Sequence, residues 1–262
     1  HWTGARPEPI PMVPEVLYFE EFRQRKQVQE LLEHKQIPIG LEFEAVEPVA
    51  KSIPSLNQLA VFAPKPERLL YCLTSIQNFI VDSGHYQYAI FDDQEENFAN
   101  YRGGATHYSS NHSEYPEIFQ KLIELMEDRE DDFEDMKEDG EVANMKEYLT
   151  KITPFILVMP NIPYVLTDMP REMEVAFVKL LQDGPKMGIY LLFGSLFNGI
   201  SGYDDASKLL KTINKGIVLG KVADQNLLKA SNLGYREPQL DDTEGYFVEN
   251  DFAEKIKVSL GR

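Results

Sequence analysis

Residues 59–70, LAVFAPKPERLL, contain the stretch of sequence that decides the fold. The apolar run 59–63 is typical of a buried strand. A short turn with two prolines and charged residues follows it, and then an apolar pattern with helical spacing. A phosphate-binding loop is laid out in this order. The residues of this stretch therefore decide whether the chain has a nucleotide site or only the fold that usually carries one.

Strands and helices alternate through the rest of the chain. The pattern predicts helices over residues 15–37, 66–81, 114–149, 171–183, 204–213 and 224–231. It predicts a strand or hairpin over 37–50, with Ile39, Leu41, Phe43 and Ala45 on one face, and a polar loop over 94–113. Further strands are expected at 86–93, 154–160, 188–196, 216–220, 244–250 and 253–260.

This alternation predicts an α/β fold with a mainly parallel, twisted sheet and helices on both faces. The last two predicted strands are expected to be antiparallel, at the C-terminal edge of the sheet. The proline-rich start, residues 1–14, is typical of an extended linker from an upstream module. Residues 15–262 are then expected to form a single domain.

Composition limits the classes of partner. Among 262 residues, 43 are acidic and 26 basic, so the formal net charge is −17. Such a surface repels a phosphate backbone, and no nucleic-acid partner is expected. One cysteine, Cys72, rules out an intramolecular disulfide, and no apolar stretch approaches the ~20 residues of a membrane-spanning helix.

Three stretches of sequence carry a resemblance to a known family: the lead-in IPIGLEFEAVEPVA before LAVFA, the strand GIYLLFGSL, and the tail INKGIVLGKVAD, NLLKAS and EGYFVEN. Together they resemble the FtsK/SpoIIIE-type P-loop ATPases from about residue 38 onward. Within that family the chain looks most like the third, C-terminal ATPase module of type VIIb secretion motors. The resemblance implies a P-loop NTPase fold of the RecA-like kind.

The resemblance also assigns the positions of the phosphate loop, Gly-x-x-x-x-Gly-Lys-Ser/Thr. In this chain they hold Ala63, Pro64, Lys65, Pro66, Glu67, Arg68, Leu69 and Leu70. Both glycines are replaced, two prolines lack the N–H that would bind phosphate, and leucines stand in place of the lysine and the hydroxyl. We therefore expect a degenerate nucleotide loop.

The second acidic motif of the family is degenerate by the same comparison. Its four apolar residues should lead into Asp-Glu, but here they lead into Pro160 and Asn161. No carboxylate is left at these positions to order Mg²⁺ or to activate water. Ser195 lies near the threonine of the family's sensor strand and is a possible sensor position. No catalytic residue is assigned, no metal or other cofactor is expected, and ATP with Mg²⁺ is expected to bind weakly at most.

Other candidates have ordinary structural explanations. His107 and His112 lie five residues apart in the polar loop, with His85 upstream, and a zinc site would need a third ligand and supporting partners. The acidic stretch 127–141 lacks the spacing of a calcium loop, and a solvated helix face explains it better. Asp92 and Asp93 end a strand, where carboxylates often form turns. Ser195 and Ser201 lack a nucleophile elbow.

A run of aromatic residues in and just after the polar loop has two explanations. It could form an interface patch or pack on the domain's own core, and both stay open here; the residues are Phe98, Tyr101, Tyr108 and Tyr115.

The resemblance implies the cytoplasmic domain of a bacterial protein anchored in the plasma membrane. Its expected role is to recognise exported proteins and to regulate neighbouring ATPase modules. The implied partners are small WXG-type or larger helical-hairpin substrates, upstream ATPase modules of the same chain, and other copies in a hexamer. One alternative is a divergent but active translocation ATPase, in which Lys65 or Arg68 binds phosphate and Asp92 binds Mg²⁺. A DNA pump is a third possibility, which the net charge of −17 disfavours.

Overall fold

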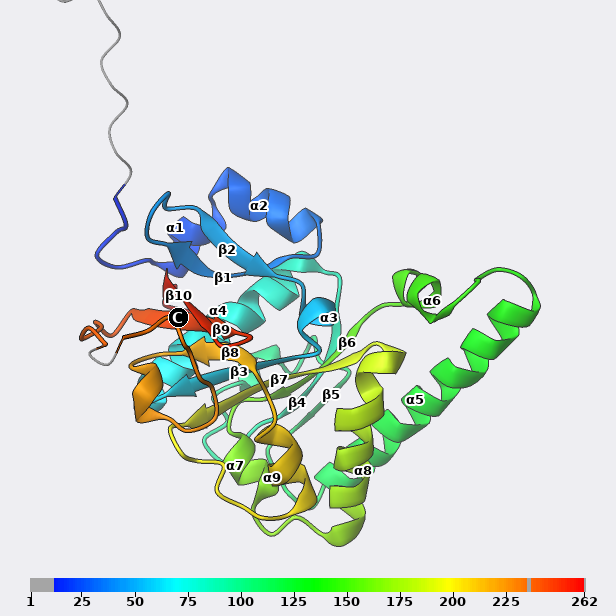
Figure 1. The fold of residues 1–262 in the computed structure, drawn as a ribbon. Coiled ribbons are helices and arrows are strands. Elements are labelled where there is room, and N and C mark those ends of the chain that lie inside the picture. The colour runs from blue at the N-terminus through cyan, green and yellow to red at the C-terminus, as the bar shows by residue number, and fades with distance from the viewer. Residues whose placement is uncertain (1–11, 235–236, 262) are drawn as a thin grey trace, which may run out of the picture.

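A ten-stranded sheet runs through the part of the chain that the computed structural model describes, residues 12–234 and 237–261 (Figure 1). The predicted linker falls mostly on residues 1–11, which lie outside the described residues. From one edge to the other the strands are β2 (Pro48–Lys51), β1 (Ile37–Glu42), β10 (Phe252–Lys257), β9 (Glu244–Glu249), β8 (Lys215–Val218), β3 (Gln58–Ala63), β7 (Ile189–Leu196), β6 (Phe155–Met159), β4 (Gln87–Phe91) and β5 (His107–Ser109).

The six strands from β8 to β5 are parallel, and the pleat of β3 shows how they divide the core. Leu59, Val61 and Ala63 belong to the cluster on one face, whereas Ala60 and Phe62 belong to the cluster on the other. Because both faces are apolar, helices have to cover both. The predicted fold class, a mainly parallel α/β sheet between two helical layers, is therefore confirmed.

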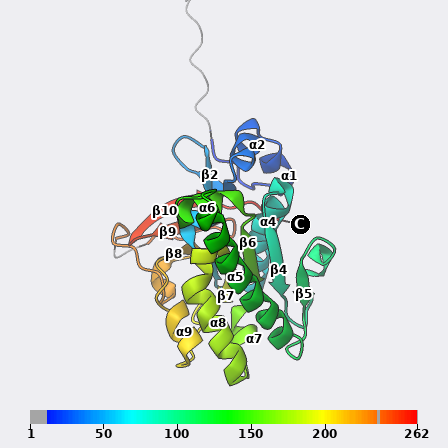
Figure 2. The ribbon, with the colours of Figure 1, turned by 90° about the vertical axis from the view of Figure 1, so that its right-hand side faces the viewer.

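Each face has its own helices (Figures 1 and 2). The first face is covered by α1 (Phe19–Arg23), α2 (Lys26–Glu33) and α4 (Pro66–Ser83). The second is covered by α5 (Tyr115–Glu138), α7 (Ile162–Leu166), α8 (Arg171–Asp183) and α9 (Asp205–Leu210). Figure 2 shows α5 and α8 lying side by side across the sheet. Among the described residues, no helix is both long and apolar enough to cross a bilayer.

The other half of the sheet is antiparallel. β9 and β10 pair with each other as predicted, but the hairpin β1–β2 pairs with β10 and forms the outer edge. The expected alternation over 37–45 is wrong beyond β1. The strand ends at Glu42, whose carboxylate accepts hydrogen bonds from the N–H groups of Glu44 and Ala45, so the chain turns before Phe43 and Ala45 can join it.

Two other expectations need correction. The polar loop 94–113 contains the short strand β5, which extends the parallel sheet beside β4, and the 3₁₀ turn η1 (Ala99–Tyr101). Residues 224–231 are not an α-helix. Gln225 accepts hydrogen bonds from the N–H groups of Leu227 and Leu228 and donates to the carbonyls of Val222 and Leu228. Its side chain thus takes the backbone groups that a helix would pair.

The predicted helix over 114–149 is two helices. The first half of α5 packs on the sheet, and its second half packs against α6 (Met145–Lys151) through a small separate cluster of Phe133, Val142 and Tyr148. Figure 1 shows this end of α5, with α6, standing out from the body of the domain. The remaining short helical segments are α3 (Ile53–Leu56), η2 (Gly184–Met187) and η3 (Val222–Asp224).

Candidate functional site

The carboxyl ends of the parallel strands meet at one edge of the sheet, where ligands bind in folds of this kind. The connection after β3 leads past β7 and β6 to β4, while the connection after β7 leads past β3 to β8. The strand order therefore reverses between β3 and β7. A cavity of about 140 Å³, the strand-end cavity, lies at this point. The last residue of β7 and the segments that follow β3, β4 and β6 line it.

The β3–α4 connection is short and has few backbone N–H groups. β3 ends at Ala63 and α4 begins at Pro66, so only Pro64 and Lys65 lie between them. Lys65 has an extended backbone, with φ −137° and ψ 145°, and its side chain is exposed. Pro64 and Pro66 have no N–H, and Glu67 is an exposed acid in the first turn of the helix.

Leu69, which the resemblance places at the lysine position, is buried at 8% exposure against strand β7. The strand contributes Gly194 there, and a Cβ atom at this glycine would lie 3.0 Å from Cδ1 of Leu69 and closer still to Leu73. The missing side chain lets α4 pack directly on β7. Leu69 and Leu73 therefore occupy the space beside the carboxyl ends of β3 and β7, while Leu70, at the hydroxyl position, is half-buried.

The Arg68 side chain binds the turn at residues 241–244, which leads into β9. Its guanidinium donates hydrogen bonds of 2.9–3.0 Å to the carbonyl oxygens of Asp241, Asp242 and Glu244. Only 10% of the side chain is exposed, and Oδ1 of Asp242 lies 3.7 Å away. The residue fastens the turn before β9 to the start of α4, so its charge is directed away from the cavity.

Asn161 and Asp93 connect two of the segments around the cavity. Nδ2 of Asn161 donates to Oδ2 of Asp93 at 2.8 Å, and Oδ1 of Asn161 accepts from the N–H of Tyr164 in the first turn of α7. Pro160, the other residue of the second motif, is buried beside them. The Asn161 side chain thus caps a helix and binds a carboxylate at the position where the motif would carry its own.

Asp92 holds together the loop that follows β4. It is 1% exposed, and its carboxylate accepts hydrogen bonds from the N–H groups of Asp93 and Phe98 and from the hydroxyl of Tyr108. Burial raises the pKa of the Asp92 carboxyl, although these donors oppose the shift. The tyrosine hydroxyl of Tyr115 also donates to the backbone carbonyl of Asp92. Asp92 therefore acts as a turn-forming residue.

The other residues that the sequence analysis singled out are buried or make hydrogen bonds within the domain. Ser195 is 1% exposed, and its hydroxyl donates to the carbonyl of Leu196, next to it in the chain. Nε2 of His112 lies 2.7 Å from the carbonyl oxygen of Tyr164, and their rings stack 4.1 Å apart. Burial raises the pKa of Cys72 to about 12. Of the four aromatic side chains in and just after the polar loop, Phe98, Tyr101 and Tyr115 are buried. Tyr108 is half-buried, and its hydroxyl donates to Asp92.

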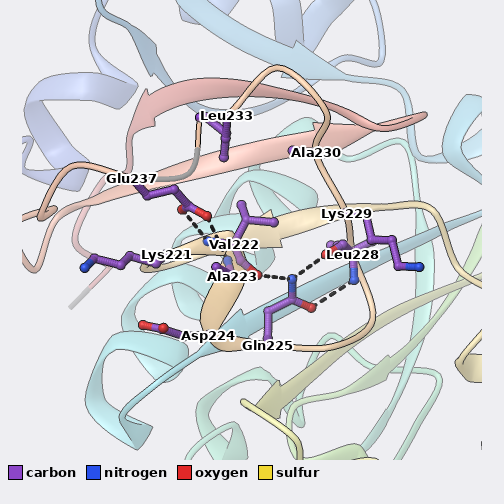
Figure 3. Close-up of a pocket in the computed structure, with 11 residues that line it drawn as sticks. Lys221, Val222, Ala223, Asp224, Gln225, Leu228, Lys229, Ala230, Leu233 and Glu237 are labelled. Carbon is purple, nitrogen blue, oxygen red and sulfur yellow. Dashed lines mark hydrogen bonds between the residues drawn. The ribbon is translucent and has the colours of Figure 1, made fainter.

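A second cavity, of about 710 Å³, borders the segment after β8 (Figure 3). Its polar side chains bind the segment itself: the Glu237 carboxylate accepts from the N–H groups of Val222 and Ala223 at 2.7 and 2.8 Å. Lys221 and Lys229 point in opposite directions in Figure 3. No set of groups converges here on one point among the described residues, so the strand-end cavity is the better candidate site.

A sheet of this order, with helices on both faces and a strand, turn and helix at its switch point, defines the class as a P-loop NTPase-type α/β domain. No family model matches the chain. It is 27% identical over 270 residues to the type VII secretion system protein EssC of Staphylococcus aureus strain MRSA252, an alignment that covers 99% of this chain and 16% of EssC. The chain is homologous to EssC, and it spans about a sixth of the length of that protein.

Solved structures agree on the fold. The cytoplasmic domain of EssC superposes with a TM-score of 0.85 at 18% identity, over 98% of this chain and 49% of that one. ATPases 2 and 3 of EccC from Thermomonospora curvata, in complex with a signal sequence peptide, superpose with a TM-score of 0.72 at 17% identity, over 99% of this chain and 46% of that one.

Proposed function

We propose that this domain is the third, catalytically degenerate ATPase module of a type VIIb secretion motor. In this proposal it recognises exported proteins and regulates neighbouring ATPase modules instead of hydrolysing ATP. The motor would be anchored in the bacterial plasma membrane, with this domain in the cytoplasm. The observation that carries the proposal is the buried position of Leu69 at the place of the phosphate-binding lysine.

The geometry around Leu69 supports the loss of ATP hydrolysis. The connection before α4 leaves two residues where a phosphate loop needs room to curl, and one of them is a proline. The two cations nearest in sequence do not replace the lysine: Arg68 is bonded to the turn before β9, and Lys65 is on the exposed strand-to-helix link. Asn161 has no negative charge with which to hold Mg²⁺.

The homology supports the role in secretion. EssC is a type VII secretion system protein, and an EccC fragment with ATPases 2 and 3 has been solved with a signal sequence peptide. We infer that this chain acts with upstream ATPase modules of its own polypeptide, assembles with other copies of itself in a hexamer, and takes WXG-type or larger helical-hairpin proteins as substrates. Such regulation requires that this domain has two conformational states that differ in their affinity for the substrate. Substrate binding here would then change the activity of a neighbouring module.

Calorimetric titration of the domain with Mg-ATP, together with a phosphate-release assay, tests whether the domain has lost ATP hydrolysis. We expect no turnover and at most weak binding. Magnesium-dependent turnover would refute it and favour the active translocation ATPase. Titration with a WXG-type protein from the same genome tests the recognition role, and we expect saturable binding. Absence of binding to the WXG-type protein would contradict the recognition role.

A further inference from the structure

The strand-end cavity combines apolar walls with an acidic end. Six apolar residues line it, which are Pro66, Leu69, Leu70, Leu73, Pro160 and Leu196. The polar residues are Asp92, Asp93, Asn97 and Asn161. None of the described residues that line it is basic, so the position where an ATPase of this class holds phosphate has here the opposite sign of charge.

The two carboxylates of the cavity have no cationic partner among the described residues. All the hydrogen bonds to Asp92 come from neutral donors, as do those to Asp93, which come from the N–H of Glu95 and the amide of Asn161. None of the ion pairs within 12–234 and 237–261 includes either residue. Asp92 is 1% exposed and Asp93 beside it is half-buried. A buried carboxylate without a counter-charge costs free energy, and a cationic ligand close to Asp92 and Asp93 would offset that cost.

The volume and the lining residues of the cavity limit the kind of cation that it can bind. A cavity of about 150 Å³ is known to hold a benzene ring, so about 140 Å³ suits a group of five or six heavy atoms. A metal ion would find too few ligands, because the described residues contain no cluster of three or more His, Cys, Asp or Glu side chains that could hold one. The leucine walls instead suit an aliphatic stem with a charged end.

A lysine side chain fits better than an arginine. Each oxygen of Asp93 already accepts one hydrogen bond, at 3.0 and 2.8 Å, so about half of the acceptor positions of this carboxylate are taken. The positions that remain accommodate the single bond of an ammonium more readily than the two parallel bonds of a guanidinium. An ammonium is a point charge that can approach either oxygen from the cavity side. Its four-carbon stem would then lie between Leu69, Leu70 and Leu196.

We propose that this cavity receives a lysine side chain from a protein partner of the domain, with the ammonium at Asp93 and the stem between the leucines. The proposal rests on the proposed function, since the same space cannot also serve a nucleotide. The rim supports a protein source: Leu196, 38% exposed, and the exposed Pro66 form an apolar border that a partner surface would cover. The net charge of −17 also favours a basic partner.

The test uses N-acetyl-lysine methylamide as the probe and its Nε-acetylated form as the uncharged control. Binding is followed by NMR through the side-chain amide signals of Asn161 and Asn97. We expect saturable shifts with the probe and none with the acetylated form, because acetylation removes the charge. Equal shifts with both, or none with the probe, would overturn the proposal. Binding of n-butylammonium without binding of the probe would indicate a small-amine site and would overturn the assignment to a protein lysine.

Matched variants locate the site. Asp93→Asn should weaken binding of the probe about tenfold, since a charge-assisted hydrogen bond is lost. Asp131→Asn removes the same charge from the exposed face of α5 and should leave the affinity unchanged. Leu196→Trp, at the rim, should block binding without disturbing the core, so the proposal stays testable if Asp93→Asn unfolds. Equal affinity in Asp93→Asn and Asp131→Asn would contradict it.

The phosphate-release assay separates this proposal from the proposed function. Hydrolysis of Mg-ATP by the same preparation would refute both, because the cavity would then serve a nucleotide. No hydrolysis together with no response to the probe would refute only the lysine site.

Discussion

The side-chain amide of Asn161 donates to the carboxylate of Asp93 across 2.8 Å, joining the segment after β6 to the segment after β4. The same asparagine caps α7. The resemblance places Asn161 where an active module would carry a carboxylate for the Mg²⁺ site. In this chain the neutral amide of Asn161 donates a hydrogen bond to Asp93. A carboxylate at position 161 would lie beside the Asp93 carboxylate.

Restoring the acid should therefore destabilise the domain. Asn161→Asp replaces a hydrogen bond with repulsion between two carboxylates, and we expect a loss of about 1–3 kcal/mol in the free energy of unfolding at pH 7. The repulsion ends when one carboxylate takes up a proton, so the loss should shrink as the pH falls toward about 4. Urea unfolding at several pH values measures this. A loss that is the same at every pH would contradict it, and Asn161→Ala, which removes the hydrogen bond without adding a charge, is the control.

Restoring the phosphate-loop residues should not restore hydrolysis. The double variant Leu69→Lys, Leu70→Ser keeps the two prolines and the short β3–α4 connection, so its backbone cannot form the N–H cradle. The variant also replaces Leu69, which is buried at 8% exposure, with a lysine. We expect this change to lower the free energy of unfolding by about 2–4 kcal/mol. Phosphate release and urea unfolding check both parts, with Leu70→Ser alone as the control. Clear magnesium-dependent turnover would contradict this account of the loop.

The strand–turn–helix layout could be predicted from sequence because local patterns determine it. The buried runs and the helical spacing placed β3, α4, β6, α8 and β7 within a residue or two of their observed bounds. Helix 224–231 was predicted wrongly because its apolar spacing is helical, while Gln225 pairs with the backbone groups of the same segment. The spacing of apolar residues does not show that a polar side chain, here Gln225, will bind the backbone groups that a helix would pair.

The partners of the site residues could not be predicted, because they come from distant parts of the sequence. Arg68 contacts the turn at 241–244, and Asn161 contacts Asp93. The role of Gly194 was also missed, although a glycine inside a buried strand is a usable signal of close packing. The residues that replace the phosphate loop were visible in the sequence, but the cavity between them was not.

Arg68 and Lys65 are three residues apart and should respond very differently to alanine. Arg68→Ala leaves three carbonyl oxygens of the 241–244 turn without their donor, and we expect a loss of about 2–3 kcal/mol. Lys65→Ala removes an exposed side chain and should change stability by less than about 0.5 kcal/mol. Urea unfolding of both variants is the measurement. A large loss in Lys65→Ala would mean that this lysine is buried in a contact that the described residues do not show.

Cys72 should be inert to thiol reagents while the domain is folded. It is 2% exposed, and burial raises its pKa to about 12, so the reactive thiolate is scarce at pH 8. Above the pKa of an unfolded cysteine, about 8.5, the unfolded chain loses this proton first, so the thiol's contribution to stability falls as the pH rises toward 12. Labelling with a chromogenic disulfide at pH 8, with and without urea, checks this. Rapid labelling of the folded domain would show that α4 is open there.

Gly194→Ala tests the packing that closes the nucleotide position. The new Cβ would lie 2.5 Å from the carbonyl oxygen of Pro160 and 3.0 Å from Cδ1 of Leu69, so we expect a loss of about 2 kcal/mol or more. Gly103→Ala, where nothing lies within 4 Å of the new atom, is the matched control and should be neutral. Adding Leu73→Ala to Gly194→Ala should cost less than the sum of the two single variants, because the smaller side chain relieves one of the clashes. Additive losses would mean that α4 does not rest on Gly194, and the space beside β3 and β7 would then be open to a ligand.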